Sequence, residues 1–113
     1  MTDKPEPTAD GTWLYTIETE YGVMDGSLEL RQVDQELAGD FVNMGARAVI
    51  FDGRVDGERL SFNSTLRTRM SVMMLRVEAT FDADLMQGML MTPLGDSPFS
   101  ARRAKATQSK QRP

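Results

Sequence analysis

Apolar and polar side chains alternate along most of the central part of this chain. From Trp13 to Thr19, every second side chain falls on one side of an extended backbone, and that side starts with an indole, a phenol and an isoleucine. A period of two is typical of a β-strand with one buried face. The same alternation recurs between short turns, and it predicts strands over 12–20, 26–32, 37–42, 47–55, 59–67, 71–81, 85–92 and 97–103.

Short turns separate these predicted strands. Asp56-Gly57 is the strongest hairpin signal, because both residues suit the positive φ angles of a type I′ turn. Residues 71–81 are rich in Met and Leu and could also form a helix, but their alternation favours a strand. A strand and turn roughly every 11 residues predicts an all-β domain with little helix. Closure removes unpaired edges, so we predict an eight-stranded antiparallel up-and-down barrel; a sandwich, or a half-barrel completed by a partner, is the alternative.

The apolar faces of these strands define a predicted interior. An eight-stranded barrel is just wide enough to be filled by side chains or to hold one small ligand, and the sequence leaves both open. In the second case, we expect a pocket for an apolar or aromatic molecule at the end opposite Trp13. The expected ligand-binding residues are Tyr15, Thr19, Phe41, Phe51, Phe62 and Ser64. The predicted inward set is Trp13, Tyr15, Ile17, Leu28, Leu30, Phe41, Val49, Phe51, Leu60, Phe62, Leu75, Val77, Phe81, Met86, Leu90 and Phe99.

Methionine is unusually frequent, with nine copies, and five of them fall in the strands over 71–81 and 85–92. The alternation places some of these methionines outside, and an apolar outer face needs a cover. We therefore expect self-association as a homodimer or larger, unless the alternation is inverted here and the methionines line the core. Arg76 and Glu78 share this face, either as polar anchors of an interface or as solvated charges. The expected interface residues are Val72, Met74, Met89 and Met91.

Charge is distributed unevenly along the chain, whose formal net charge is −4. All 17 acidic residues and only eight of the 13 basic ones precede position 101. An acidic domain repels phosphate backbones, so we expect no nucleic-acid partner. The barrel domain should span 11–103, between a disordered leader over 1–10 and a basic disordered tail over 104–113.

The composition and the motifs also exclude several kinds of functional site. There is no cysteine and no histidine, so we expect no metal site and no cofactor. No apolar run is long enough for a membrane helix and the start has no signal-peptide core, so the expected location is the cytoplasm. No catalytic motif is present, and the sequence leaves open whether the chain is an enzyme. The acid–base candidates are Glu18, Glu20, Asp52, Tyr15, Tyr21 and Arg67.

Several short motifs resemble those of lipocalin and calycin barrels. Gly11-Thr12-Trp13 is similar to the glycine-any-tryptophan signature of their first strand, and small lipocalin-like bacterial domains share the later spacing. The resemblance implies that Trp13 plugs one end of the barrel and that Arg103, or failing that Arg102, packs across it. The later motifs are Leu28-Glu29-Leu30, Leu37-Ala38-Gly39, Gly53-Arg54-Val55, Leu60-Ser61-Phe62, and Phe99 with Ala101 and Arg103.

The calycin fold serves carriers, inhibitors and enzymes, so it does not by itself fix a function. Our first expectation is a self-associating binding protein for an apolar or aromatic small molecule. One alternative is a cofactor-free isomerase or cyclase that uses the barrel interior. Another is an interaction module that accompanies a larger enzyme.

Overall fold

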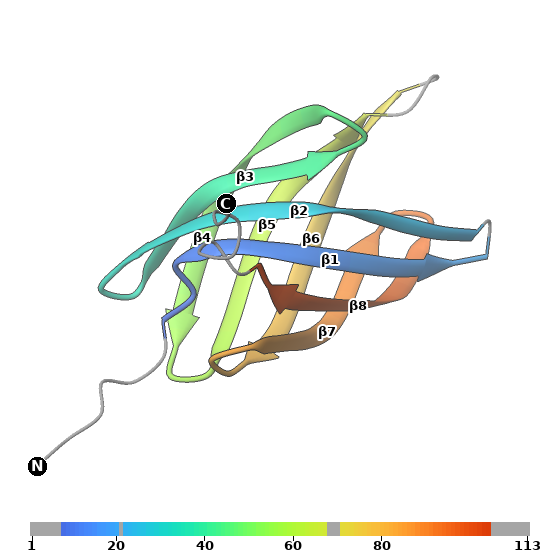
Figure 1. The fold of residues 1–113 in the computed structure, drawn as a ribbon. Coiled ribbons are helices and arrows are strands. Elements are labelled where there is room, and N and C mark those ends of the chain that lie inside the picture. Colours follow the sequence, from blue (N-terminus) through green and yellow to red (C-terminus); the bar gives the residue numbers. More distant parts are fainter. Residues whose placement is uncertain (1–7, 21, 68–70, 105–113) are drawn as a thin grey trace, which may run out of the picture.

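Eight antiparallel strands close into one barrel in the computed structural model, which describes residues 8–20, 22–67 and 71–104 (Figure 1). Each strand pairs with its neighbours in sequence, and the last strand pairs with the first, so the barrel is an up-and-down meander. The all-β barrel prediction is confirmed, and within the described ranges there is no helix. The strands are β1 (Gly11–Thr19), β2 (Gly22–Val33), β3 (Glu36–Asn43), β4 (Ala46–Asp56), β5 (Arg59–Arg67), β6 (Val72–Phe81), β7 (Leu85–Thr92) and β8 (Gly95–Arg103).

The barrel has two different ends. At one end, the chain enters β1 at Gly11 and leaves β8 at Arg103, next to the turns that follow β2, β4 and β6. We name this the tryptophan end, because Trp13 pairs with Arg103 there. The opposite end, on the right in Figure 1, carries the β1–β2, β3–β4 and β7–β8 hairpins, and we name it the mouth.

The predicted inward face is correct in every strand except β4. On β1, for example, Trp13, Tyr15 and Ile17 are all buried. Residues 72–81 form a strand and not a helix, and Leu75 and Val77 point into the core as expected. Alternation was thus sufficient to orient these strands, because only one of their faces is buried.

β4 turns its other face inward halfway along its length. Val49 is 68% exposed and Phe51 is 37% exposed, whereas Ile50 is only 4% exposed, so the prediction that Val49 and Phe51 face inward is wrong. The cause is a β-bulge: opposite β3, the register advances by three residues on β4, from Ile50 to Gly53, for two on its partner. Asp52 lies in this step with a φ of 54°, in the left-handed region. The extra residue restores the expected inward side beyond the bulge.

This reversal can be tested by two conservative substitutions. Ile50→Val removes one buried methylene and should lower the free energy of unfolding by about 0.5–1.5 kcal/mol. Val49→Ala, which removes more carbon from an exposed side chain, should change it by less than about 0.5 kcal/mol. Urea unfolding followed by circular dichroism measures both. If Val49→Ala lowered the free energy of unfolding more than Ile50→Val, β4 would have the orientation that the sequence pattern predicted.

Two predicted turns lie elsewhere in the structure. The loop between β4 and β5 is Gly57-Glu58, because Asp56 pairs with Arg59, so this turn comes one residue later than predicted. Met44-Gly45, with φ angles of 53° and 83°, fits the type I′ turn that was expected at Asp56-Gly57. β2 begins at Gly22, so residues 22–25, which the sequence left between the predicted strands over 12–20 and 26–32, belong to a strand.

The expected disordered leader is partly packed onto the barrel. Ala9 is fully buried, and its amide donates a hydrogen bond of 2.8 Å to the side-chain oxygen of Gln32. A carboxylate oxygen of Asp10 accepts a hydrogen bond of 2.5 Å from the backbone N–H of Gln32. Residues 8–10 therefore belong to the closure of the tryptophan end, while residues 1–7 and the tail over 105–113 lie outside the described residues.

Candidate functional site

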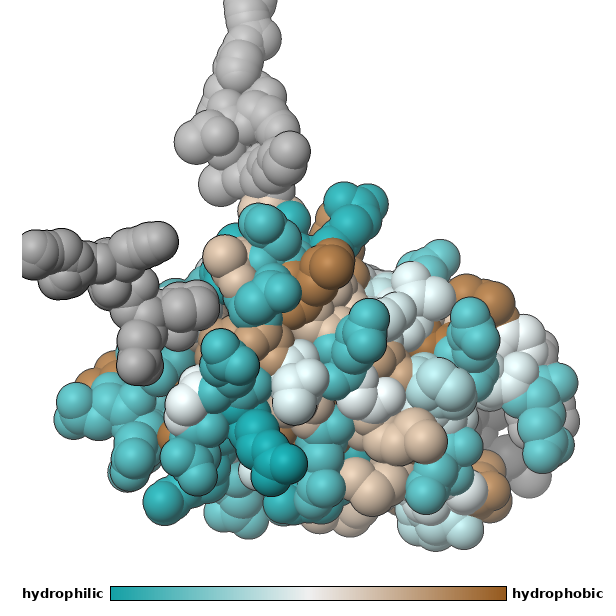
Figure 2. All heavy atoms as spheres, turned by 90° about the horizontal axis from the view of Figure 1, so that it is seen from below, coloured by the Kyte–Doolittle hydropathy of each residue, from teal (hydrophilic) through white to brown (hydrophobic). Residues whose placement is uncertain are grey.

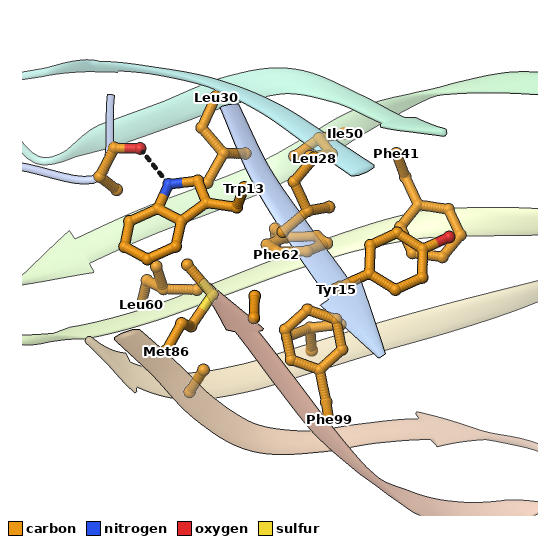
Figure 3. Packing of buried hydrophobic residues seen from close by; sticks show 14 of the residues in the cluster. Trp13, Tyr15, Leu28, Leu30, Phe41, Ile50, Leu60, Phe62, Met86 and Phe99 are labelled. Carbon is orange, nitrogen blue, oxygen red and sulfur yellow. Dashed lines mark hydrogen bonds between the residues drawn. The ribbon is translucent and has the colours of Figure 1, made fainter. Parts of the chain in front are cut away.

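A buried tryptophan closes one end of the barrel. Trp13 Nε1 donates a hydrogen bond of 3.0 Å to the carbonyl of Ala9, drawn as a dashed line in Figure 3. The guanidinium carbon of Arg103 lies 4.3 Å from the centre of the Trp13 ring, which confirms the predicted cation–π contact. Phe81 meets the indole edge-to-face, with ring centres 6.4 Å apart. The indole is fully buried between these groups, so we interpret this end as structural.

Arg103 also joins the residues before β1 to the turn between β6 and β7. Its Nε donates to the carbonyl of Ala83 at 2.6 Å, and its Nη2 donates to the carbonyl of Thr8 at 2.8 Å. Its Nη1 donates to the carbonyl of Asp10. The planar guanidinium can serve all three carbonyls while it covers the indole, which an ammonium group could not do.

The middle of the barrel is filled by aromatic side chains. The Tyr15 ring is stacked on Phe41 at 5.0 Å between centroids and on Phe99 at 5.7 Å, as Figure 3 shows. Its hydroxyl donates to the carbonyl of Val42 at 2.8 Å. Burial, with a smaller contribution from the Asp25 carboxylate, raises the pKa of Tyr15 far above its usual value. The phenol therefore stays protonated and acts as a packing residue with one satisfied donor.

Phe62 and Ser64 belong to the same filled region. Phe62 is fully buried at the centre of the view in Figure 3. The Ser64 hydroxyl is also fully buried and donates to the carbonyl of Val49 at 3.0 Å. Neither side chain lines the cavity described next, and a buried hydroxyl with a partner does not demand a ligand.

The mouth contains a cavity of about 530 Å³. Ile17 and Phe41, both buried, contribute to its base, and Leu66 and Met73 approach it from the β5–β6 side. Its full described lining is Ile17, Glu18, Thr19, Glu20, Gly22, Val23, Met24, Phe41, Leu66, Met73, Leu90, Thr92, Leu94, Gly95, Asp96 and Ser97. A cavity of this size, apolar inside with a few polar groups, is typical of small-molecule sites.

The expected ligand-binding residues are only partly brought together. Thr19 and Phe41 line the mouth cavity. Tyr15, Phe62 and Ser64 lie in the filled region, and Phe51 lies on the outer surface because of the β4 bulge. The mouth residues that the prediction missed include Met24, Leu66, Met73 and Leu90. Each of these residues lies on the inward face of its strand and close to the mouth, and this position could have identified it.

The mouth cavity is acidic at its rim. Glu18, Glu20 and Asp96 contribute to its lining, and no lysine or arginine is among the described residues that line it. Carboxylates near a low-dielectric cavity favour cations and disfavour anions. The negative charge at the rim should therefore affect which ligands enter the cavity.

The acid–base candidates do not form a catalytic group in the described part of the chain. Glu18 and Glu20 are exposed at the mouth, and Asp52 lies at the bulge, where it accepts a hydrogen bond of 3.4 Å from Asn63. Tyr21 and the side chain of Arg67 lie outside the described residues. Across residues 8–20, 22–67 and 71–104, no three acidic side chains are close enough to hold a metal ion.

The expected interface residues lie on the outside of the barrel. Val72 and Met74 on β6 are about half exposed, and Met89 on β7 is 42% exposed. Met91 is half-buried. The outward orientation is therefore correct, and the alternative in which these methionines line the core is excluded.

The part of the chain that the structure describes contains no helix that is long and apolar enough to cross a membrane.

Comparison with known proteins shows a similarity of fold. No model of a protein family matches the chain, and no curated protein matches it either. Among solved structures, the chain is similar to a redesigned β-barrel, mFAP1, bound to DFHBI, with a TM-score of 0.59 and 15% sequence identity. The similarity covers 84% of this chain and 94% of that one. At such low identity the similarity shows a shared β-barrel fold and not a shared function.

Proposed function

We propose that this chain is a binding protein that holds a small apolar molecule, neutral or positively charged, in the mouth of the barrel. The mouth cavity of about 530 Å³ is the observation that carries the proposal. Its base is apolar, at Ile17, Phe41 and Leu90, and the charged residues in the described part of its rim are acidic. An apolar body would bury against the base, and the rim would discriminate against anions.

Two similarities support this function. The redesigned barrel with a similar fold holds DFHBI, which agrees with a barrel of this kind receiving one small molecule. The Gly11-Thr12-Trp13 start and the later motifs resemble calycins, in which the tryptophan end is closed. A closed tryptophan end leaves the mouth as the entrance for a ligand.

A matched pair of probes tests the proposal directly. N-phenyl-1-naphthylamine is neutral and apolar, and its 8-sulfonate adds one negative charge to the same skeleton. We expect the neutral probe to bind one molecule per chain with enhanced fluorescence. At low salt the sulfonate should bind at least about fivefold more weakly, and added salt should narrow the difference by screening the rim carboxylates. Equal binding of both probes would contradict the charge preference, and no binding of either would contradict the pocket.

A substitution at the mouth locates the binding site. Leu66→Trp places a larger side chain in the cavity and should raise the Kd of the neutral probe at least about tenfold by occupying its space. Leu85→Trp is the matched control, because Leu85 is exposed on β7 and does not line the cavity. It should change Kd by less than about twofold. Equal effects of both variants would place the probe elsewhere.

The enzymatic alternative receives no support from the interior. Tyr15, which lies in the filled region of the barrel, donates its hydrogen to the Val42 carbonyl and has a raised pKa. A general base must instead accept a proton near neutral pH. Glu18 and Glu20 are at the exposed rim, where solvent competes with any proton transfer. The binding function is therefore the better account of this site.

A further inference from the structure

The outer surface of β6 and β7 combines exposed methionines with one ion pair. Met74 is 50% exposed and Met89 is 42% exposed. Arg76 Nε donates to a carboxylate oxygen of Glu78 at 2.9 Å, and both side chains remain about half exposed. Figure 2 views the molecule from the side that lies lowest in Figure 1, near β7 and β8, and shows apolar side chains interspersed with polar ones. Such a mixture is typical of interfaces between subunits that also exist alone.

Strand register places these groups in two adjacent rows. Arg76 on β6 lies opposite Met91 on β7, and Glu78 lies opposite Met89. Each row thus has one charged and one thioether side chain, and the two charges have opposite signs. A surface that carries a positive and a negative group side by side can pair with a copy of itself, because each group can meet its opposite.

We propose that this face joins two copies of the chain around a two-fold axis. The axis would lie in the interface, perpendicular to β6, and pass between Arg76 and Glu78. This operation brings Arg76 of one copy to Glu78 of the other, and Met89 to Met91 of the other. One axis therefore satisfies both the charges and the methionines, which a head-to-tail contact would not do.

The surrounding surface is complementary under the same axis. Met74 lies two residues before Arg76, so the rotation carries it to the region of Thr80 on the other copy, two residues beyond Glu78. That region is hollowed: a surface groove of about 470 Å³ is lined by Thr80, Gln87 and Gly88, and also by the charged side chains of Arg54, Asp56, Arg59, Arg76 and Glu78. A projecting apolar side chain thus meets a depression.

The choice of a second copy rests on this self-complementarity. An unrelated acidic or basic partner would be attracted by one of the two charges and repelled by the other. A purely apolar partner would leave both charges desolvated without a new partner, which costs free energy. A second copy supplies the opposite charge to each, and this inference does not depend on whether the mouth binds a ligand.

Charge reversal tests the axis. Sedimentation velocity over a dilution series should show the natural chain in a monomer–dimer equilibrium. Arg76→Glu alone makes both groups acidic and Glu78→Arg alone makes both basic, so each variant should dimerise at least about tenfold more weakly. An equimolar mixture of the two variants should recover a dimer with one copy of each. An intrachain role of the ion pair cannot produce this recovery.

Controls separate the interface from effects on folding. Each variant should retain the circular dichroism spectrum and unfold within a few degrees of the natural chain, because the ion pair is exposed. Met74→Ser should weaken the dimer, whereas Val33→Ser, at a side chain 70% exposed at the end of β2, should not. A chain that stays monomeric at the highest soluble concentration would overturn the proposal. So would a dimer that is indifferent to charge reversal, or a mixture that fails to recover it.

Discussion

Trp13→Ala is expected to lower the free energy of unfolding by about 3–5 kcal/mol, as large aromatic truncations in cores do. The side chain is fully buried, and its loss would open a cavity between Ala9, Phe81 and Arg103. The Ala9 carbonyl would lose its donor, and the Arg103 guanidinium would lose the ring on which it lies. Urea unfolding followed by circular dichroism measures the change without relying on tryptophan fluorescence.

Two companion variants show which contact matters. Trp13→Phe keeps an aromatic ring but has no N–H group for Ala9, so its cost should be smaller than that of alanine. Arg103→Lys keeps the charge but cannot bond three carbonyls and cover the indole at once, so it should also destabilise the barrel. If Trp13→Ala cost less than about 1 kcal/mol, the closed end would not stabilise the barrel as inferred here.

The tryptophan end could be predicted because its determinants are local in sequence or carried by a motif. Trp13 is followed by regular alternation, and this alternation alone orients β1. Arg103 was placed by resemblance, and the structure confirms its contact with the indole. The role of residues 8–10 could not be predicted, because Ala9 is small and its hydrogen bonds with Trp13 and Gln32 are not shown by any alternation of the sequence.

The orientation of β4 could not be predicted from its pattern. Val49, Ile50 and Phe51 are consecutive and all apolar, so either alternate set could face inward. The bulge that decides between them depends on Asp52 adopting a positive φ, for which the sequence gives no glycine signal. For this reason Phe51 lies on the outer surface and not on the inward face where it was expected.

The mouth cavity also depends on features that a sequence pattern does not carry. Tyr15 and Ser64 were expected to orient a ligand, but each bonds a backbone carbonyl, that of Val42 or of Val49. Those carbonyls are 27 and 15 residues away along the chain. Because alternation shows only which side chains point inward, it cannot show how deep each one lies or which of them fill the space themselves.

Glycine at position 39 has a physical explanation that the resemblance alone did not give. Gly39 pairs with Leu30 on β2 and with Ile50 on β4, directly beside the bulge. Its φ of 148° is one that side chains rarely adopt, and an added Cβ would lie 1.8 Å from the carbonyl oxygen of Glu29. The absence of a side chain therefore lets β2 approach where the register of β3 and β4 shifts.

Gly39→Ala is accordingly expected to lower the free energy of unfolding by at least about 3 kcal/mol, because the β2 backbone must move away. Gly45→Ala is the matched control, since Gly45 also has a positive φ of 83° but nothing lies within 4 Å of an added Cβ. It should cost only the conformational penalty of about 1–2 kcal/mol. Urea unfolding of both variants separates steric overlap from backbone strain. Equal costs would mean that strain alone explains Gly39 and that the close approach of β2 contributes nothing to it.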